Sequence, residues 1–332
     1  MIPALLAIAF AQLNPGAQGI GAFQRGDYRA ARASLERASA SDSRARAFLA
    51  LTRAALGECE AVLADLQRDA ANSDAAMRRF SGLALAQCHI AAKRFVDAMP
   101  VVARLEKEFP KDADVLFLAA NYHMKAWNDA IYRMYQNAPA SYRTDQLSAE
   151  VFETQGRMTE AIAEFRKAIA KNPRAINLHY RLGRALLQQS HGPAALEEAR
   201  KEFDAELALN PSDAVAEYQV AQIFATQGKK AESSARFERA LQLRPDFSEA
   251  LIAVAKLRTE AKKYPEAVAL LERAVKLQPR SEIARYNLML AYRNSGRTAD
   301  ALQAKAELDK LQKPPEGEFA DFLKRLGEKP QQ

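Results

Sequence analysis

Histidine and cysteine are the side chains through which this chain of 332 residues could bind a metal or carry out redox chemistry. The sequence holds four histidines and two cysteines. Zinc ligands usually occur in pairs with roughly two to five residues between the two ligands, and these six residues form no such pairs. We therefore predict that the chain has no metal site and no cofactor. The six residues are Cys59, Cys88, His89, His123, His179 and His191.

Carboxylates and nucleophiles give no stronger indication of catalysis. The sequence contains neither a phosphate-binding Gly-Lys-Ser/Thr loop nor a Gly-x-Ser-x-Gly nucleophile motif. Asp and Glu are numerous, but on amphipathic helices most of them face solvent, and nothing in the sequence selects two as a general acid and base. We predict that the chain is not an enzyme.

Cys59 and Cys88 leave two interpretations open. In an exported protein an even pair of cysteines can form a disulfide. Free cysteine is also among the most buried residue types, where it packs as a small apolar group. We favour the second interpretation.

The net charge of +7 raises the possibility of a polyanionic partner. Most charged stretches, however, mix both signs, as in Glu106-Lys107-Glu108. Such mixing is typical of solvated helix faces. We therefore do not expect a nucleic-acid partner. Nucleic-acid binding through the basic pairs Arg78-Arg79 and Lys93-Arg94 is kept as the alternative function.

Residues 1–11 are uncharged and apolar and end in Ala9-Phe10-Ala11. The small-x-small ending is the form of a signal-peptidase site, although the segment is short and has no preceding Lys or Arg. We expect export to the periplasm or outside the cell, with an apolar cap in a cytoplasmic protein as the alternative. No apolar stretch reaches the roughly 20 residues that a membrane-spanning helix needs.

The second half of the chain repeats with a period near 34 residues. Five small residues are spaced by 38, 34, 34 and 34: Ala161, Ala199, Ser233, Ala267 and Ala301. Each of the first four small residues is followed, four positions later, by a large apolar residue: Phe165, Phe203, Phe237 and Leu271. Eight residues further comes a proline: Pro173, Pro211, Pro245 and Pro279. Three tracks at one period indicate a structural repeat.

Each unit has the pattern of two helices. In residues 214–245, apolar residues recur at helical spacing, Gly228 interrupts them, and the pattern resumes until Arg244-Pro245. Because proline cannot donate the helical hydrogen bond, we expect the second helix to end there. Small residues such as Gly183 and Ala221 should let the two helices of a unit approach closely.

These residues resemble the tetratricopeptide repeat. Its pattern has a glycine at the turn, then an aromatic, an alanine, a Phe or Tyr, another alanine and a proline. The matching positions are Gly26, Tyr28, Ala31, Leu35, Ala38; Phe95, Ala98, Val102, Pro110; Gly156, Met158, Ala161, Phe165, Ala168, Pro173; Gly228, Ser233, Phe237, Ala240, Pro245; Tyr264, Ala267, Leu271, Ala274, Pro279; Gly296, Ala301.

The resemblance implies an all-α fold, an α-solenoid wound as a right-handed superhelix of about nine helix-turn-helix repeats. Repeats in residues 12–141 are divergent, and those in residues 142–313 match well. Residues 314–332 should hold a capping helix, since residues 319–326 carry one apolar stripe and the last repeat has no neighbour.

Two units depart from the pattern. The unit in residues 112–142 has Ala126 and Asn128 where the turn glycine and the following aromatic belong. The unit in residues 176–211 carries about four extra residues around Gln189 and Pro193. We expect this insertion to lengthen the turn between its helices.

The resemblance further implies that the first helices line a concave groove, which binds a partner. One row of side chains there would hold Tyr180, Tyr218, Ile252 and Tyr286, and the next Arg184, Gln222, Lys256 and Leu290, with Arg293 and Asn294 at the end. Rigid aromatics flanked by cations suit a peptide or protein segment with acidic groups. We therefore expect a non-catalytic adaptor or assembly factor that binds a peptide or protein.

Overall fold

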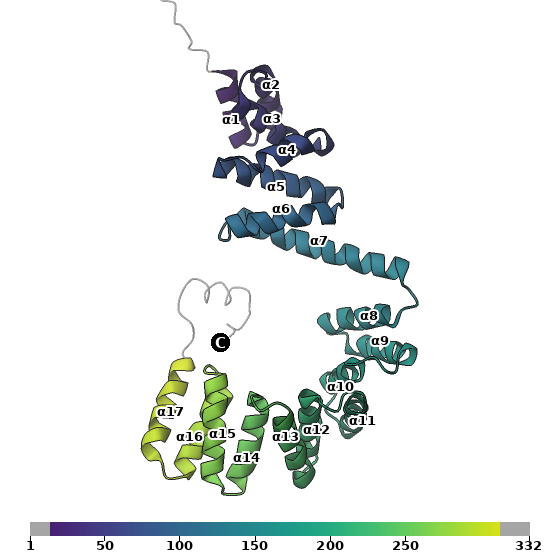
Figure 1. Ribbon diagram of the computed structural model, residues 1–332, viewed down its shortest axis with the longest axis vertical. Coiled ribbons are helices and arrows are strands. Elements are labelled where there is room, and N and C mark those ends of the chain that lie inside the picture. The colour runs from purple at the N-terminus through teal and green to yellow at the C-terminus, as the bar shows by residue number, and fades with distance from the viewer. Residues whose placement is uncertain (1–13, 313–332) are drawn as a thin grey trace, which may run out of the picture. The chain divides into compact units, whose positions relative to one another are not determined.

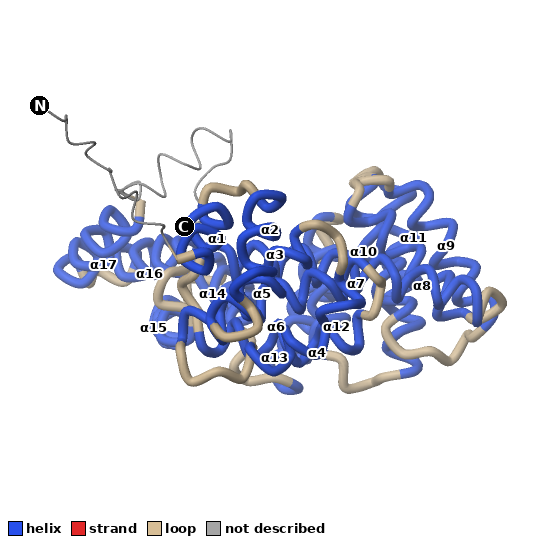
Figure 2. Tube along the Cα trace, turned by 90° about the horizontal axis from the view of Figure 1, so that it is seen from above, coloured by secondary structure: helices blue, strands red, loops and turns tan. Residues whose placement is uncertain are grey.

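The computed structural model describes residues 14–312, and every regular element in that range is a helix (Figures 1 and 2). The all-α prediction is confirmed. The chain divides into two compact units, unit 1 (Met1–Asn137) and unit 2 (Ala138–Gln332). The expected signal segment in residues 1–11 and the expected capping helix in residues 319–326 lie outside the described residues.

Unit 1 contains seven α-helices and one short 3₁₀ helix within the described range. Neighbouring helices in chain order pack against each other, and the alternate helices α1, α3, α5 and α7 also contact in sequence. The elements are α1 (Pro15–Gln24), α2 (Tyr28–Ala38), α3 (Ser43–Ala55), η1 (Cys59–Val62), α4 (Leu63–Asp69), α5 (Ala75–Ala91), α6 (Phe95–Glu108) and α7 (Ala113–Asn137).

Unit 2 contains ten described helices, which form five antiparallel pairs, each helix packed against the next along the chain (Figure 1). They are α8 (Tyr142–Thr154), α9 (Met158–Lys171), α10 (Leu178–Gln189), α11 (Pro193–Leu209), α12 (Ala214–Thr226), α13 (Lys230–Leu243), α14 (Ser248–Glu260), α15 (Tyr264–Leu277), α16 (Glu282–Asn294) and α17 (Thr298–Leu311). This stacking of helix pairs is that of a helical repeat.

Short polar residues and prolines set the helix ends. Asp213 begins α12 because its carboxylate accepts the backbone N–H groups of Val215 and Ala216 at 2.9 and 3.0 Å, which have no partner within the helix. The helices α9, α11, α13 and α15 each end two residues before a proline, as the sequence predicts. The repeat boundaries therefore follow from local backbone chemistry.

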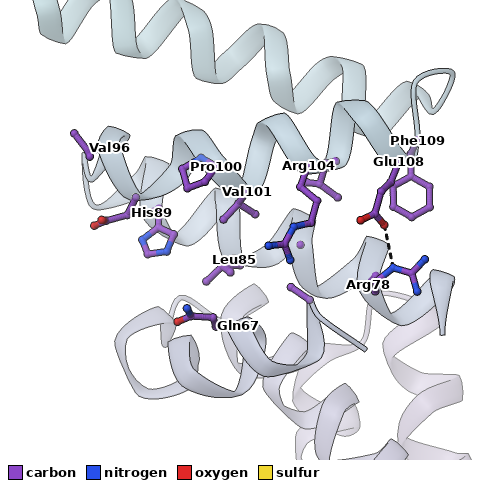
Figure 3. Close-up of a pocket in the computed structure, with 14 residues that line it drawn as sticks. Gln67, Arg78, Leu85, His89, Val96, Pro100, Val101, Arg104, Glu108 and Phe109 are labelled. Atoms are coloured by element: carbon purple, nitrogen blue, oxygen red, sulfur yellow. Dashed lines mark hydrogen bonds and ion pairs between the residues drawn. The ribbon is translucent and has the colours of Figure 1, made fainter. Parts of the chain in front are cut away.

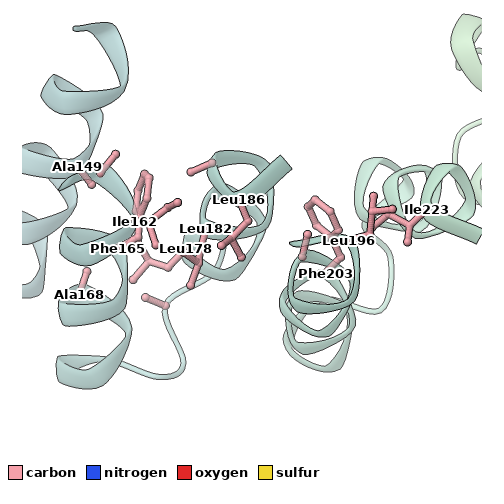
Figure 4. Packing of buried hydrophobic residues seen from close by; sticks show 14 of the residues in the cluster. Ala149, Ile162, Phe165, Ala168, Leu178, Leu182, Leu186, Leu196, Phe203 and Ile223 are labelled. Atoms are coloured by element: carbon pink, nitrogen blue, oxygen red, sulfur yellow. The ribbon is translucent and has the colours of Figure 1, made fainter. Parts of the chain in front are cut away.

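The core of unit 2 consists of the periodic apolar residues and the small residues opposite them (Figure 4). Phe165 and Phe203 have no exposed surface. A Cβ atom added at Gly183 of α10 would lie 2.8 Å from Cε1 of Phe203 on α11. The expectation that Gly183 permits close helix packing is confirmed, because the ring of Phe203 occupies the space that a side chain would take.

The unit predicted in residues 112–142 is not a helix pair. A single helix of 25 residues, α7, runs through Ala126 and Asn128, where the turn was expected. No glycine is present there to adopt the left-handed conformation of the turn, and the residues around Ala126 are compatible with helix. The described residues therefore contain eight helix pairs and one long single helix, and not nine pairs.

The longer turn predicted around Gln189 and Pro193 is also wrong. Residues 190–192 separate α10 from α11, and residues 227–229 separate α12 from α13, so the two turns have equal length. The insertion lengthens α11 instead, which has 17 residues against 14 in α13. Pro193 explains why the extra residues belong to α11 and not to the turn. Proline is favoured in the first turn of a helix, so α11 starts at Pro193, directly after the turn.

Candidate binding surfaces

The first helices of the pairs in unit 2 carry all ten side chains that were predicted to line a groove. Tyr180 and Arg184 lie on α10, Tyr218 and Gln222 on α12, Ile252 and Lys256 on α14, and Tyr286, Leu290, Arg293 and Asn294 on α16. The structure brings four of them together around one hollow of about 460 Å³. These four are Tyr218, Gln222, Ile252 and Lys256.

Tyr218 is held rigidly at the edge of this hollow. Its ring packs against the rings of Phe237 and Phe247, with centroids 5.4 and 5.1 Å away. Its hydroxyl oxygen accepts a hydrogen bond of 2.5 Å from the side-chain amide of Gln222. Burial raises the pKa of the Tyr218 phenol, so the group stays neutral at ordinary pH.

Charged groups of both signs surround the same hollow. Lys256 is exposed and makes no ion pair within the described range. Of the two carboxylates that line the hollow, Glu260 is 3.0 Å from Lys230, whereas Glu249 has no ion-pair partner among the described residues. Counting partners within residues 14–312, the hollow therefore presents one unpaired cation and one unpaired anion beside an apolar wall that contains Ile252.

The other predicted groove residues lie elsewhere. Tyr180 is half-buried and packs against the core, with its ring 5.7 Å from that of Phe203, and burial raises the pKa of its phenol. Tyr286 is 51% exposed and does not line the hollow. Arg184, Arg293 and Asn294 are exposed on α10 and α16, outside this hollow.

A second, larger hollow of about 700 Å³, which was not predicted from the sequence, lies in unit 1. Residues of α3, α5 and α7 line most of it, including the exposed aromatic residues Phe80 and Phe117. Exposed phenylalanines on successive first helices were the available signal. These phenylalanines do not stand out in the sequence, because the repeats before residue 142 match the pattern weakly.

Cys59 and Cys88 are joined by a disulfide, so the interpretation as free core cysteines is wrong. Their Cα atoms are 5.4 Å apart, and both residues line the hollow of unit 1. The stacking of η1 against α5 brings together two positions that are separated by 29 residues in sequence. Sequence alone does not reveal this contact, because it depends on the register between the two repeats.

Carboxylates neutralise most of the basic pairs that suggested nucleic-acid binding. Arg78 lies 2.9 Å from Glu108, and Arg94 lies 2.6 Å from Glu60. Arg79 lies 2.6 Å from Asp112 and lowers the pKa of that carboxyl to about 2. Cations paired in this way are less able to contact phosphates, so the structure gives this alternative function no support.

Within residues 14–312, no three His, Cys, Asp or Glu side chains come together as metal ligands. Among the same residues, none of the helices combines the length and apolar character needed to cross a bilayer.

Comparison with known proteins identifies two matching sequence families. The TPR repeat matches residues 151–190, and the bacterial transcriptional activator domain matches residues 222–313. No curated protein sequence matches the chain.

Several solved structures are similar at low sequence identity. A MamA structure is 16% identical with a TM-score of 0.45, covering 52% of this chain and 91% of that chain. MamA from Desulfovibrio magneticus RS-1 is 14% identical with a TM-score of 0.46, covering 53% and 97%. YrrB, described as a TPR protein with an unusual peptide-binding site, is 16% identical with a TM-score of 0.44, covering 59% and 98%.

Proposed function

The chain is a tetratricopeptide-repeat protein, and from this premise we propose that it is a non-catalytic interaction module that binds a segment of a partner protein. The role is that of an adaptor or assembly factor. The observation that carries the proposal is the hollow of unit 2, where Tyr218, Gln222, Ile252 and Lys256 come together from two successive first helices.

The chemistry of this hollow suits a segment with an apolar side chain next to an acidic one. Ile252 and the fixed ring of Tyr218 supply a preformed apolar contact, which costs little conformational entropy on binding. Lys256 is free to pair with a carboxylate of the partner. Glu249 repels a second carboxylate, so the two charges together orient the segment along the hollow.

Site-specific photo-crosslinking tests the proposal in the cells that make the protein. A benzophenone amino acid replaces Gln222 in the hollow, and in a matched control it replaces Arg239, which is exposed on α13 away from the hollow. We expect one discrete crosslinked partner from position 222 and none from position 239. Lys256→Glu should reduce that crosslink about tenfold, since it places like charges together.

Equal crosslinking from both positions would contradict the proposal, as would a crosslink at position 222 that Lys256→Glu leaves unchanged. The Lys256→Glu variant therefore distinguishes a specific contact with an acidic group from non-specific apolar binding. Lys256 is exposed, so its substitution leaves the packing of α14 intact.

We also propose that the protein is exported. The disulfide between Cys59 and Cys88 supports this, because disulfides persist mainly in oxidising compartments. Sequencing the N-terminus of the protein from its own cells tests the proposal. A mature chain that starts at Gln12 is the expected result, and a chain that retains residues 1–11 in the cytoplasmic fraction would overturn it.

A further inference from the structure

A third hollow, of about 440 Å³, lies in unit 1 between α4 and α6, with α5 as its floor (Figure 3). This third hollow is separate from the hollow of about 700 Å³ in unit 1, because no residue of α3 or α7 lines the third hollow. Its volume is in the lower part of the range of small-molecule pockets, roughly 300 to 1,000 Å³.

Most of the lining is apolar. Leu85 of α5, Val101 and Leu105 of α6, and Phe109 directly after α6 line the space. Gly82 lies on the floor, where an added Cβ would come within 2.9 Å of Leu105 Cδ2. The hollow therefore offers an apolar body a surface that water covers poorly.

Arg104 of α6 is a cation at this hollow that has no anionic partner among the described residues. Glu108, one turn later on the same helix, would ordinarily pair with it. Instead Glu108 lies 2.9 Å from Arg78, which also donates to the backbone carbonyls of Asn72 and Ser73. Arg104 consequently makes no ion pair with any residue in the range 14–312.

Two further polar groups lie at the other end of the hollow. Nδ1 of His89 is buried and has no hydrogen-bond partner among the described residues. Asp97 lies seven residues before Arg104 on α6, which is about 10 Å along the helix axis. The carboxylate of Asp97 disfavours a second anion at that end, whereas Arg104 attracts one.

We propose that this hollow binds a small carboxylic acid with an apolar body. The carboxylate pairs with the guanidinium of Arg104, which offers a planar set of donors to it. The apolar body packs on Leu85, Val101 and Leu105. This site is independent of the proposed partner-binding hollow in unit 2.

Decanoate is a suitable probe, with decanol as its uncharged counterpart, and calorimetric titration of the full chain gives the affinity. We expect decanoate to bind at least tenfold more tightly than decanol. Arg104→Met should remove that difference while keeping the apolar contact. Lys107→Met is the matched control, because Lys107 is an exposed cation on α6 that does not line the hollow. It should leave the affinity unchanged.

Methyl NMR locates the binding without reliance on any variant. The methyl signals of Leu85, Val101 and Leu105 should shift saturably with decanoate, while those of Leu51, which lines the other hollow of unit 1, should not. The proposal is overturned if decanoate does not bind, if only Leu51 responds, or if Arg104→Met binds decanoate as tightly as the native chain.

Discussion

The carboxylate of Glu206 accepts the backbone N–H of Asn177 at 2.8 Å, 29 residues earlier in the chain. Glu206 lies on α11 and is completely buried, and its second oxygen is 3.3 Å from the backbone nitrogen of Tyr180. Asn177 precedes α10 in a left-handed conformation and makes no side-chain cap of its own. The neighbouring helix therefore supplies the cap of α10.

Removing this cap should destabilise unit 2. We expect Glu206→Ala to lower the free energy of unfolding by about 3 kcal/mol, since two backbone donors lose a charged acceptor in a buried place. The free energy of unfolding of Glu206→Gln should lie between those of the native chain and of Glu206→Ala, because the glutamine amide oxygen can still accept one hydrogen bond. Urea unfolding measures both. Glu198→Ala, at a surface ion pair with Arg166, is the control and should cost less than about 1 kcal/mol. A cost for Glu206→Ala as small as that of the control would show that the cap is unimportant.

The disulfide between Cys59 and Cys88 should stabilise unit 1. It closes a loop of 29 residues in the unfolded chain, for which about 3.5 kcal/mol is expected. A chemical reductant should therefore lower the urea midpoint of the native chain, with no effect on a Cys59→Ala/Cys88→Ala variant. Alkylation followed by mass measurement checks the bond itself: two adducts should appear only after reduction.

The pKa values of His179 and His89 should be shifted in opposite directions from that of a free histidine. Nδ1 of His179 lies 2.6 Å from a carboxylate oxygen of Glu202, and this hydrogen bond raises the pKa of His179 above 6.5. Its protonated form thus adds stability that is complete below pH 6.5 and is lost as pH rises through the raised pKa. Burial, aided by Arg94, lowers the pKa of His89. The stability from neutral His89 is present above pH 6.5 and is lost as pH falls through the lowered pKa.

NMR titration of the imidazole signals measures both values in one sample. Glu202→Gln should move the His179 midpoint down toward 6.5 and leave the His89 midpoint in place. A His179 midpoint at or below 6.5 in the native chain would contradict the assigned hydrogen bond.

The repeat, its helix ends and its close packing could be predicted because each depends on local chemistry. Pro245 ends α13, and Gly183 admits the ring of Phe203, whatever the rest of the chain does. The disulfide and the hollow beneath Arg104 could not be predicted in this way. Each depends on the register between neighbouring repeats, which cannot be predicted from a single sequence.

The α7 region shows a different limit. Its sequence lacks a turn glycine, and this local signal outweighs the period of the repeat, since α7 is continuous from Ala113 to Asn137. The buried residues of α7, from Val115 to Tyr122, all lie in its first half. A repeat can therefore lose its turn and continue as one helix when local propensity favours it.

The turns at Gly228 and Lys262 allow the cost of a left-handed residue to be measured within one protein. The two positions are 34 residues apart, and their φ angles are +73° and +59°. The backbone N–H of each donates to the carbonyl three residues earlier, at 3.0 Å in both turns. The two turns therefore share the left-handed conformation and this hydrogen bond, with a different residue type at the left-handed position.

Exchanging the two residue types should change stability in opposite directions. Lys262→Gly should raise the free energy of unfolding by about 1 kcal/mol, because glycine adopts positive φ without a Cβ clash. Gly228→Lys should lower it by about as much, and the cost is conformational, since no atom lies within 4 Å of an added Cβ there. Urea unfolding of the two single variants and of the double variant gives the values. The double variant should match the native chain, because the sites lie on separate turns and their effects add. A loss of stability in Lys262→Gly would mean that the Lys262 side chain contributes more than its backbone conformation costs.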